Sequence, residues 1–447
     1  MSKLVHAQWS SKMTFVLAAA GSAVGLGNIW RFSYMVGDSG GAAFVLIYLA
    51  CVALVGLPIL VAEWLIGRRG QENPINAMAD LARRNGRLPA WALVGASGVL
   101  AAFLILSFYS VIGGWSLSYT LSSVTGAFSG QDADGIGALF SGLLGSPITL
   151  TLWHTAFMAL VIFIVARGVT KGLEGAVRTL MPGLVLLLIV LVGYGMTTGH
   201  FGEALAFMFR PDWSAVTGGV VLAAMGQAFF TLSLGMGIMM AYGSYLGEEV
   251  NLMSTARTVI ILDTVIALLA GMAIFPIVFA NGMSPGEGPG LIFVSLPVAF
   301  GNMAGGTILG LMFFLLLTFA ALTSAISLLE PVVELVEERT PLSRVGATLV
   351  GGVAVWALGI AALMSFNVWD GFLVFGLNIF DLLDTFTSKV LLPLTGLGAV
   401  LFVAWCLDRN SVADELNLAG GKERLWHLVA RYVAPIGVIV VFVTGLL

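Results

Sequence analysis

A few polar side chains interrupt long apolar stretches of this chain, and their chemistry is the first clue to its function. Asp263 lies in TVIILDTVIALLAG, Glu63 lies in LVAEWLIGR, and Arg31 ends the glycine-rich segment GSAVGLGNIWR. A buried carboxylate or guanidinium without a partner costs several kcal/mol in an apolar environment. We therefore expect each group to be neutralised or paired, and we expect Asp263 to have a functional role.

Small side chains on a predicted helix form a second candidate set. Ala320, Thr323 and Ser324 lie at positions i, i+3 and i+4, so they share one face of that helix. Taken alone, the two hydroxyl groups are typical of side chains that bond back to their own helix.

The composition defines the elements that must position these groups. The chain has 447 residues, of which 59% are hydrophobic and 10% are charged, and its mean hydropathy is +1.00. Soluble domains carry about 25% charged residues, so the polar surface is too small for a water-soluble protein. Alternating ten-residue strands are absent, which predicts an all-α, polytopic membrane protein.

Eleven membrane-spanning helices are predicted within a single membrane domain over residues 1–447. Apolar runs of about 20 residues, the length that crosses the hydrocarbon core, recur along the chain. The segment 284–303 is too short and too rich in proline and glycine to cross, and it is expected to form short helices in an outer loop. The predicted spans are 12–36, 41–67, 89–124, 148–166, 172–197, 217–246, 254–281, 308–337, 344–364, 372–406 and 425–447.

The distribution of Lys and Arg predicts the orientation. If the N-terminus is cytoplasmic, all of the twenty Lys and Arg residues face the inside except Arg31, Arg210 and Lys389. This asymmetry indicates a cytoplasmic N-terminus. The expected location is the plasma membrane of a bacterium, that is, its inner membrane, and the role of Lys389 stays open.

Two predicted spans carry glycine-rich interruptions at corresponding positions. GSAVGLGN occupies residues 21–28 of the first span, and GQAFFTLSLGMG occupies residues 226–237 of the sixth. Close helix packing through small residues is one interpretation. Interrupted helices in matching places of two halves instead indicate a transporter's binding site, because unwound backbone exposes N–H groups to a carboxylate and carbonyl groups to a cation.

These segments carry a resemblance to a known family. GSAVGLGNIWRF, the sixth-span motif FFTLSLGMG and the eighth-span motif FAALTSAIS resemble the neurotransmitter:sodium symporter family, whose fold is that of the bacterial leucine transporter. The resemblance covers essentially the whole chain. It implies an inverted repeat of five plus five helices over residues 12–197 and 217–406, with helices 1 and 6 discontinuous and helix 11 at residues 425–447.

The resemblance implies two sodium sites, Na1 and Na2. Na1 would be completed by the substrate carboxylate and would use Ala23, Asn28, Thr231 and Asp263. Na2 would use the backbone oxygens of Gly21, Val24 and Ala320 with the hydroxyl groups of Thr323 and Ser324. A hard cation prefers several oxygen ligands, which these residues supply. Animal members need chloride nearby, and we hypothesise that the charge of Asp263 replaces it, so no chloride requirement is expected.

The resemblance also implies an amino-acid site between the two interruptions. The substrate carboxylate would meet the N–H groups of Leu26 and Gly27 and the hydroxyl of Tyr109, and the amine would meet carbonyl groups near Ala23, Phe230 and Thr231, beside Ser233. The side-chain pocket would be lined by Ile105, Phe230, Met236, Ala325 and Leu328. This lining is apolar, so a hydrophobic substrate is expected, bulky and aromatic ones included.

Gates on both sides of this site are implied in the same way. Outside, Arg31 and Asp384 would close over the substrate with Phe230 as a lid, although two separately solvated charges are the alternative. Inside, Glu338 would latch the N-terminal segment, with Tyr245 and Trp9 nearby. Relatives have an arginine as the partner of this acid, whereas this chain has His6 there, with Lys3 as another candidate.

A hinge is implied at the start of the fifth span. Gly172 and Pro182, with nine residues between them, would let the helix start unwind and open a water path to Na2. An ordinary capping role is the alternative. In relatives, the glutamate that matches Glu63 hydrogen-bonds the broken sixth span.

The predicted function is that of a sodium-coupled symporter that imports a hydrophobic amino acid by alternating access. A proton-coupled transporter of the same fold, with Asp263 or Glu63 as proton carrier, and a substrate-sensing receptor are the alternatives. No nucleotide-binding loop and no nucleophile–base or metal-ligand set appears, so neither ATP-driven transport nor an enzyme is expected. The partners are the amino acid and the bilayer, with no nucleic acid; the oligomeric state stays open. The four histidines lie far apart in the sequence and suggest no metal-ligand set; they are His6, His154, His200 and His427.

Overall fold

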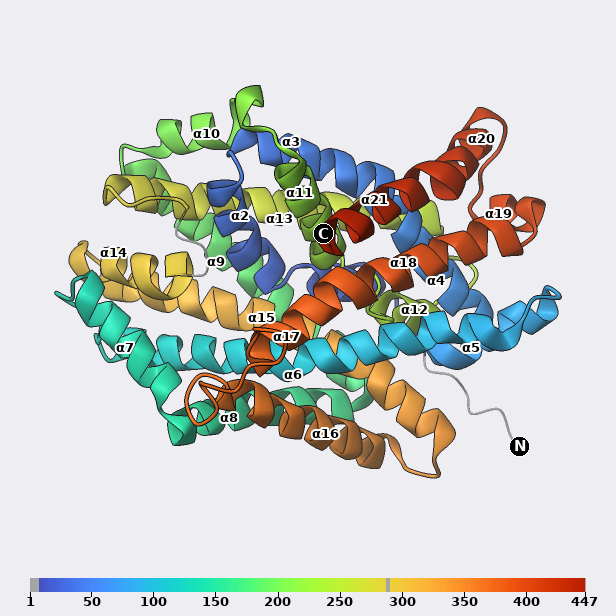
Figure 1. Ribbon diagram of the computed structural model, residues 1–447, viewed down its shortest axis with the longest axis horizontal. Coiled ribbons are helices and arrows are strands. Elements are labelled where there is room, and N and C mark those ends of the chain that lie inside the picture. The colour runs from blue at the N-terminus through green and yellow to red at the C-terminus, as the bar shows by residue number, and fades with distance from the viewer. Residues whose placement is uncertain (1–7, 287–289, 447) are drawn as a thin grey trace.

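The protein is a bundle of long helices that run roughly along one axis of the molecule (Figure 1). A computed structural model describes residues 8–286 and 290–446 of the chain. Within these ranges the only β-type contact is a bridge between Val374 and Leu377, so the predicted all-α fold is confirmed.

Nine helices in the described ranges are long and apolar enough to cross a membrane. Several contain a short π- or 3-10-helical segment (η), which is written as part of the helix. The nine are α3–η2–α4 (Ala42–Gly70), η3–α6 (Pro89–Val124), α8 (Pro147–Ala166), η4–α9 (Val169–Thr197), α13 (Leu252–Ala280), α15 (Gly306–Arg339), α16 (Arg344–Met364), α17–η7–α18–η8 (Ile379–Cys406) and α20–η9–α21 (Gly421–Leu446).

The first predicted span is broken, as the sequence indicated. Helix α1 (Lys12–Ala23) ends before Val24, whose backbone is extended with φ −76° and ψ 91°. The chain resumes as η1 (Gly27–Arg31) and α2 (Phe32–Asp38), and the two halves are bent by 52°. The break therefore covers residues 24–26, a shorter stretch than the predicted 21–28.

The sixth predicted span is also broken. Helix α11 (Gly218–Thr231) and helix α12 (Ile238–Ser244) are separated by residues 232–237. Ser233, Gly235 and Gly237 in this break have φ angles of 53°, 75° and 69°, which no α-helix accommodates. The predicted break began at residue 226 and is wrong in its first half, because residues 226–231 continue α11. By length and composition the described residues contain nine spans, or ten when α1 with η1–α2 is counted as one, so the count of eleven depends on the broken pair α11 and α12.

Shorter helices lie between the spans. The segment predicted to form short outer helices contains η6 (Leu291–Ser295) and α14 (Leu296–Asn302). The tenth span begins at Ile379 and not at residue 372, because the bridge between Val374 and Leu377 closes a turn first. The sequence did not indicate the others, which are α5 (Pro74–Arg84), α7 (Ala133–Gly145), α10 (Phe201–Phe209), η5 (Trp213–Ala215) and α19 (Arg409–Glu415).

Helix α15 lies at the centre of the bundle and positions the site. It packs against α6, α9, α1 and α16, and the stretch from Leu316 to Leu329 is almost entirely buried. Helix α8, by contrast, exposes large apolar side chains such as Ile148 and Leu152, as expected where a helix faces lipid. The inverted relation between residues 12–197 and 217–406 stays a prediction.

Candidate functional site

The two helix breaks meet at a small buried cavity. Ser233 in the sixth-span break donates a hydrogen bond to the carbonyl oxygen of Ser22 (2.9 Å), and the Ser22 hydroxyl donates to Ser233 Oγ (3.3 Å). The volume open to the centre of a water molecule is about 20 Å³. The cavity is lined by Ser22, Ala23, Gly25, Gly27, Ile105, Tyr109, Phe230, Ser233, Met236, Ser324 and Leu328.

Most of the residues predicted to bind substrate lie around this cavity. Leu26, Thr231 and Ala325 are the exceptions, since none of the three lines it. Thr231 and Ala325 are fully buried, and the side chain of Leu26 lines a neighbouring cavity. The predicted binding set omitted Ser22 and Gly25, although both lie in the glycine-rich motif.

The backbone at the first break is directed toward Tyr109. The N–H group of Leu26, which was predicted to meet a substrate carboxylate, donates to the Tyr109 hydroxyl oxygen at 3.2 Å. The Tyr109 hydroxyl is also hydrogen-bonded to the side chain of Ser324. The start of η1 and the Tyr109 hydroxyl thus lie together at one corner of the cavity, where the sequence predicted the substrate carboxylate.

Asp263 is the centre of a fully buried polar cluster beside the cavity. Its Oδ1 accepts hydrogen bonds from Asn28 Nδ2 (2.7 Å) and Thr231 Oγ1 (3.1 Å), and its Oδ2 accepts one from the Tyr48 hydroxyl (3.3 Å). All four side chains are inaccessible to solvent. The structure therefore brings together Asn28, Thr231 and Asp263, which were predicted to form Na1, with Ala23 on the adjoining cavity wall.

Two residues of this region escaped the sequence prediction. Tyr48 contacts Asp263, and Gln227 donates through Nε2 to the carbonyl oxygen of Gly27 at 2.7 Å. Each is a lone polar side chain in an apolar run, which is the signal that identified Asp263 and which could have identified them.

The predicted Na2 residues gather where α15 passes the first break. Thr323 Oγ1 lies 3.0 Å from the carbonyl oxygen of Ala320 and 3.4 Å from that of Val24, and Ser324 Oγ donates to the carbonyl oxygen of Ser22 at 3.0 Å. The hydroxyl groups thus bond both to their own helix and to the break. Gly21 is buried one turn earlier, where an added Cβ would meet Met181 at 3.3 Å.

The outer side of the cavity is closed by an aromatic ring. Phe230 lines the substrate cavity and also an outer cavity of about 60 Å³, to which Arg31, Tyr34 and Asp384 contribute. The Arg31 guanidinium lies 4.6 Å from the centre of the Phe230 ring. Within the described residues, Arg31 and Asp384 form no ion pair shorter than 4 Å. The two predicted gate charges share a cavity, but in this structure Arg31 is held by the ring instead.

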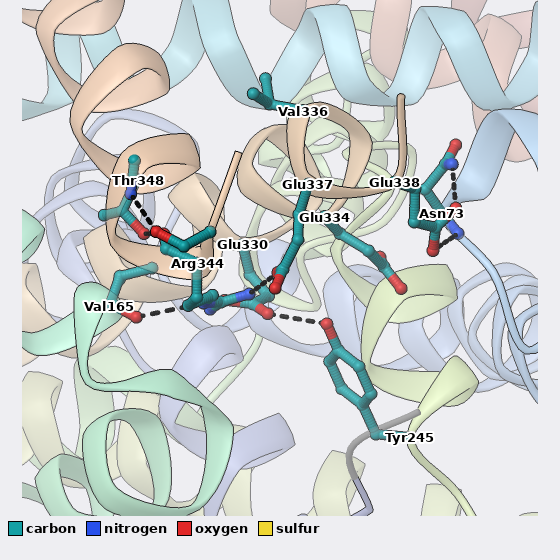
Figure 2. Close-up of polar contacts among 12 residues, drawn as sticks. Asn73, Val165, Tyr245, Glu330, Glu334, Val336, Glu337, Glu338, Arg344 and Thr348 are labelled. Carbon is teal, nitrogen blue, oxygen red and sulfur yellow. Dashed lines mark hydrogen bonds and ion pairs between the residues drawn. The ribbon is translucent and has the colours of Figure 1, made fainter. Parts of the chain in front are cut away.

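The acids predicted for the inner gate have contacts that the sequence did not indicate. Figure 2 shows Glu338 turned toward Asn73, whose N–H donates to Glu338 Oε1 at 2.9 Å, so this acid binds the start of α5. Tyr245 does not donate to Glu338 but to Glu330 Oε1 at 2.8 Å. Trp9 contacts the end of α12 through a bond from Nε1 to the Tyr242 carbonyl oxygen (3.0 Å). His6 and Lys3 lie outside the described residues.

Arg344 at the start of α16 completes this inner cluster. Its Nη2 forms an ion pair with Glu330, a fully buried acid of α15, and its Nη1 lies 3.4 Å from Glu337 Oε2 (Figure 2). Its Nε donates to the Val165 carbonyl oxygen at the end of α8. Tyr245, Glu330 and Arg344 therefore connect α12 to α15, α16 and α8. The sequence has four glutamates at the end of one helix, and it does not indicate which of them binds Tyr245 and Arg344.

Replacing Arg344 by glutamine is expected to destabilise the protein by about 3 kcal/mol, because it leaves Glu330 buried without its cation. The measurement is thermal unfolding of the purified protein in detergent. Arg339→Gln is the matched control, since Arg339 is exposed and bonds only Asn76 among the described residues. Equal unfolding temperatures for the two variants would contradict the assigned ion pair.

The two residues of the predicted hinge lie at the start of the fifth span. Gly172 lies in η4, a π-helical segment (Val169–Glu174), and Pro182 lies inside α9 (Gly175–Thr197). Gly172 lines a cleft of about 430 Å³ that reaches Leu322, the neighbour of Thr323.

The glutamate of the second span contacts the sixth-span break, as expected. Glu63 Oε1 accepts a hydrogen bond from the N–H of Gly235 at 2.8 Å.

Comparisons with known proteins match this chain over nearly its full length. A family profile described as the Sodium:neurotransmitter symporter family matches residues 6–134 and 139–447. An uncharacterized sodium-dependent transporter of Bacillus subtilis, YhdH, is 39% identical over 99% of this chain and 98% of its own length. An uncharacterized sodium-dependent transporter of Haemophilus influenzae is 35% identical, with 98% of each chain covered. The crystal structure of MhsT in complex with L-phenylalanine is 46% identical, with a TM-score of 0.90 over 98% of this chain and 99% of the other.

Proposed function

Because this chain belongs to the sodium:neurotransmitter symporter family, we propose that it is a sodium-coupled symporter that imports a hydrophobic amino acid by alternating access. The observation that carries this proposal is the meeting of the two helix breaks at one buried cavity, with oxygen-rich clusters on two of its sides. Members of this family are transporters and not enzymes. The helices that surround the cavity are those of an integral membrane protein.

The cavity lining supports an amino acid with an apolar side chain. Ile105, Met236, Leu328 and Phe230 offer no charge to a polar side chain, whereas the Tyr109 corner suits a carboxylate. MhsT, the similar structure, holds L-phenylalanine, which supports a bulky substrate. Met236 in this lining is flexible, which suits it to side chains of different shapes.

Two contact sets support two sodium sites. The Asp263 carboxylate with Asn28 and Thr231 supports Na1, next to the corner proposed for the substrate carboxylate. The carbonyl oxygens of Val24 and Ala320 beside Thr323 support Na2. Oxygen-only ligands suit a hard cation such as sodium. We further propose that Asp263 supplies the negative charge that makes chloride unnecessary.

Alternating access would use Phe230 with Arg31 and Asp384 on the outside, and the start of the fifth span on the inside. Gly172 is the proposed point of unwinding, because a π-helical segment already departs from the regular helix there. The cleft from Gly172 to Leu322 supports this side as the water path to Na2. The proposed orientation has the N-terminus in the cytoplasm.

The test is uptake of labelled phenylalanine into proteoliposomes under an inward sodium gradient. We expect accumulation that falls at least about tenfold when choline replaces sodium, because only an ion that binds one conformation better can drive the cycle. A proton gradient in sodium-free buffer is the second arm, since Asp263 and Glu63 are buried acids that could carry protons. Full uptake in that arm would replace sodium coupling by proton coupling, and binding without accumulation would indicate a receptor.

A further inference from the structure

An aromatic pair marks the predicted cytoplasmic ends of the tenth and eleventh spans. Trp405 in η8 (Phe402–Cys406) and Tyr432 in η9 (Val429–Val433) are 45% and 49% exposed, and their ring centres lie 5.9 Å apart at 80°. Tryptophan and tyrosine concentrate where a membrane protein meets the lipid headgroups. The pair therefore indicates headgroup depth on a surface that faces lipid.

Arg431 lies against this pair with unused hydrogen-bonding capacity. Its guanidinium carbon is 3.7 Å from the centre of the Trp405 ring and 5.9 Å from that of Tyr432. Its Nε is buried and donates to no acceptor, and no carboxylate of the described residues lies within 4 Å of its nitrogens. Stacking on a ring occupies the face of a guanidinium and leaves its N–H groups free to bind an anion at the edge.

A second guanidinium reaches the same tryptophan. Arg87, which follows α5, donates through Nη2 to the carbonyl oxygen of Trp405 at 3.4 Å. Like Arg431, it forms no ion pair in the described part of the chain. The acid closest in sequence to Arg431, Glu423, is already paired with Arg409 at 2.8 Å. Two cations without an ion pair in the described residues thus lie at the same tryptophan, Arg431 over its ring and Arg87 at its backbone carbonyl oxygen.

We propose that Arg87, Trp405, Arg431 and Tyr432 bind the phosphate headgroup of an anionic phospholipid of the cytoplasmic leaflet. Guanidinium groups bind phosphate oxygens in pairs, and neither Arg87 nor Arg431 has a carboxylate partner among the described residues. The half-exposed rings would contact the glycerol and the start of the acyl chains, which a free phosphate ion does not have. Basic pockets between helices on the cytoplasmic side are a known form of lipid recognition. The proposal depends on the membrane location and not on the transported substrate.

The test is thermal unfolding of the purified protein in detergent, with added phosphatidylglycerol, phosphatidylcholine or inorganic phosphate. We expect phosphatidylglycerol to raise the unfolding temperature by on the order of 3 °C, and the other two additions to have no comparable effect. Arg87→Gln and Arg431→Gln should each lose most of this rise. Arg424→Gln is the matched control, because Arg424 is an exposed arginine of α20 (Gly421–Leu428) close in sequence to Arg431. This variant should keep the rise in unfolding temperature.

Two outcomes would overturn the proposal. One is an equal rise with phosphatidylcholine or with inorganic phosphate, and the other is a full rise in both glutamine variants. Arg87 is exposed, so its variant should fold even if Arg431→Gln does not. Arg431→Lys is a further variant, which keeps the charge but loses the planar stacking, and it should retain only part of the rise.

Discussion

Replacing Asp263 by asparagine is expected to lower sodium-driven uptake in chloride-free buffer about 100-fold, the equivalent of roughly 2.7 kcal/mol. The variant removes the only charge from a cluster in which Asn28, Thr231 and Tyr48 all donate to the carboxylate. Bonds to a charged acceptor are worth about 1.5–3 kcal/mol each, and a sodium ion beside the cluster would lose its counter-charge. Added chloride should restore part of the uptake by supplying a negative charge nearby.

The measurement is initial uptake into proteoliposomes with chloride or gluconate as the anion. Asp370→Asn is the control, because Asp370 is an exposed acid in a loop, and it should behave as the parent protein in both anions. Parent uptake that itself required chloride would contradict the role given to Asp263. Unchanged uptake by Asp263→Asn would contradict it as well.

Replacing Gly25 by alanine is expected to weaken substrate binding at least about 100-fold, because the first break has no room for a methyl group. The added Cβ would lie 2.9 Å from the Tyr109 hydroxyl oxygen and would overlap Ser324 Oγ. These atoms belong to the proposed carboxylate corner and to the proposed Na2 site. Both the apparent affinity for phenylalanine and the sodium dependence of binding should therefore worsen together.

Gly226→Ala is the matched control for this effect. Gly226 lies in the helical part of α11, and an added Cβ there would meet nothing within 4 Å. Alanine is also favoured over glycine by about 1 kcal/mol inside a helix, so this variant should bind normally and be no less stable. The readout is equilibrium binding of labelled phenylalanine at several sodium concentrations. Normal binding by Gly25→Ala would show that the cavity wall is not where the structure has it.

Glycine spacing predicted both breaks but not their bounds. Gly226 and residues 227–231 stay helical because the cost of one glycine is small compared with the packing of α11 against its neighbours. The break begins only at Leu232, where positive φ angles at Ser233, Gly235 and Gly237 become necessary. A short-range pattern thus indicates where a helix is weak, and tertiary contacts decide where it ends.

The gate residues also show which features the sequence predicts and which depend on tertiary contacts. Motif position suggested Glu338 as the inner acid and Asp384 as the partner of Arg31. The structure gives Glu338 to Asn73 and brings Arg344 to Glu330, while Arg31 lies over the Phe230 ring. Neighbouring acids on one helix are equivalent in sequence, and only the helices packed against them make them different.

The sequence by itself determined the membrane class, the places of the two broken helices and most residues of the central cavity. It could do so because hydropathy, glycine content and isolated polar residues are local properties that the bilayer makes costly or permissible. Only the tertiary structure decided other polar pairs, such as Tyr48 with Asp263, which are 215 residues apart. A buried charge is stabilised by the partner that helix packing brings within hydrogen-bond distance. That partner cannot be predicted from one segment, because it belongs to another part of the chain.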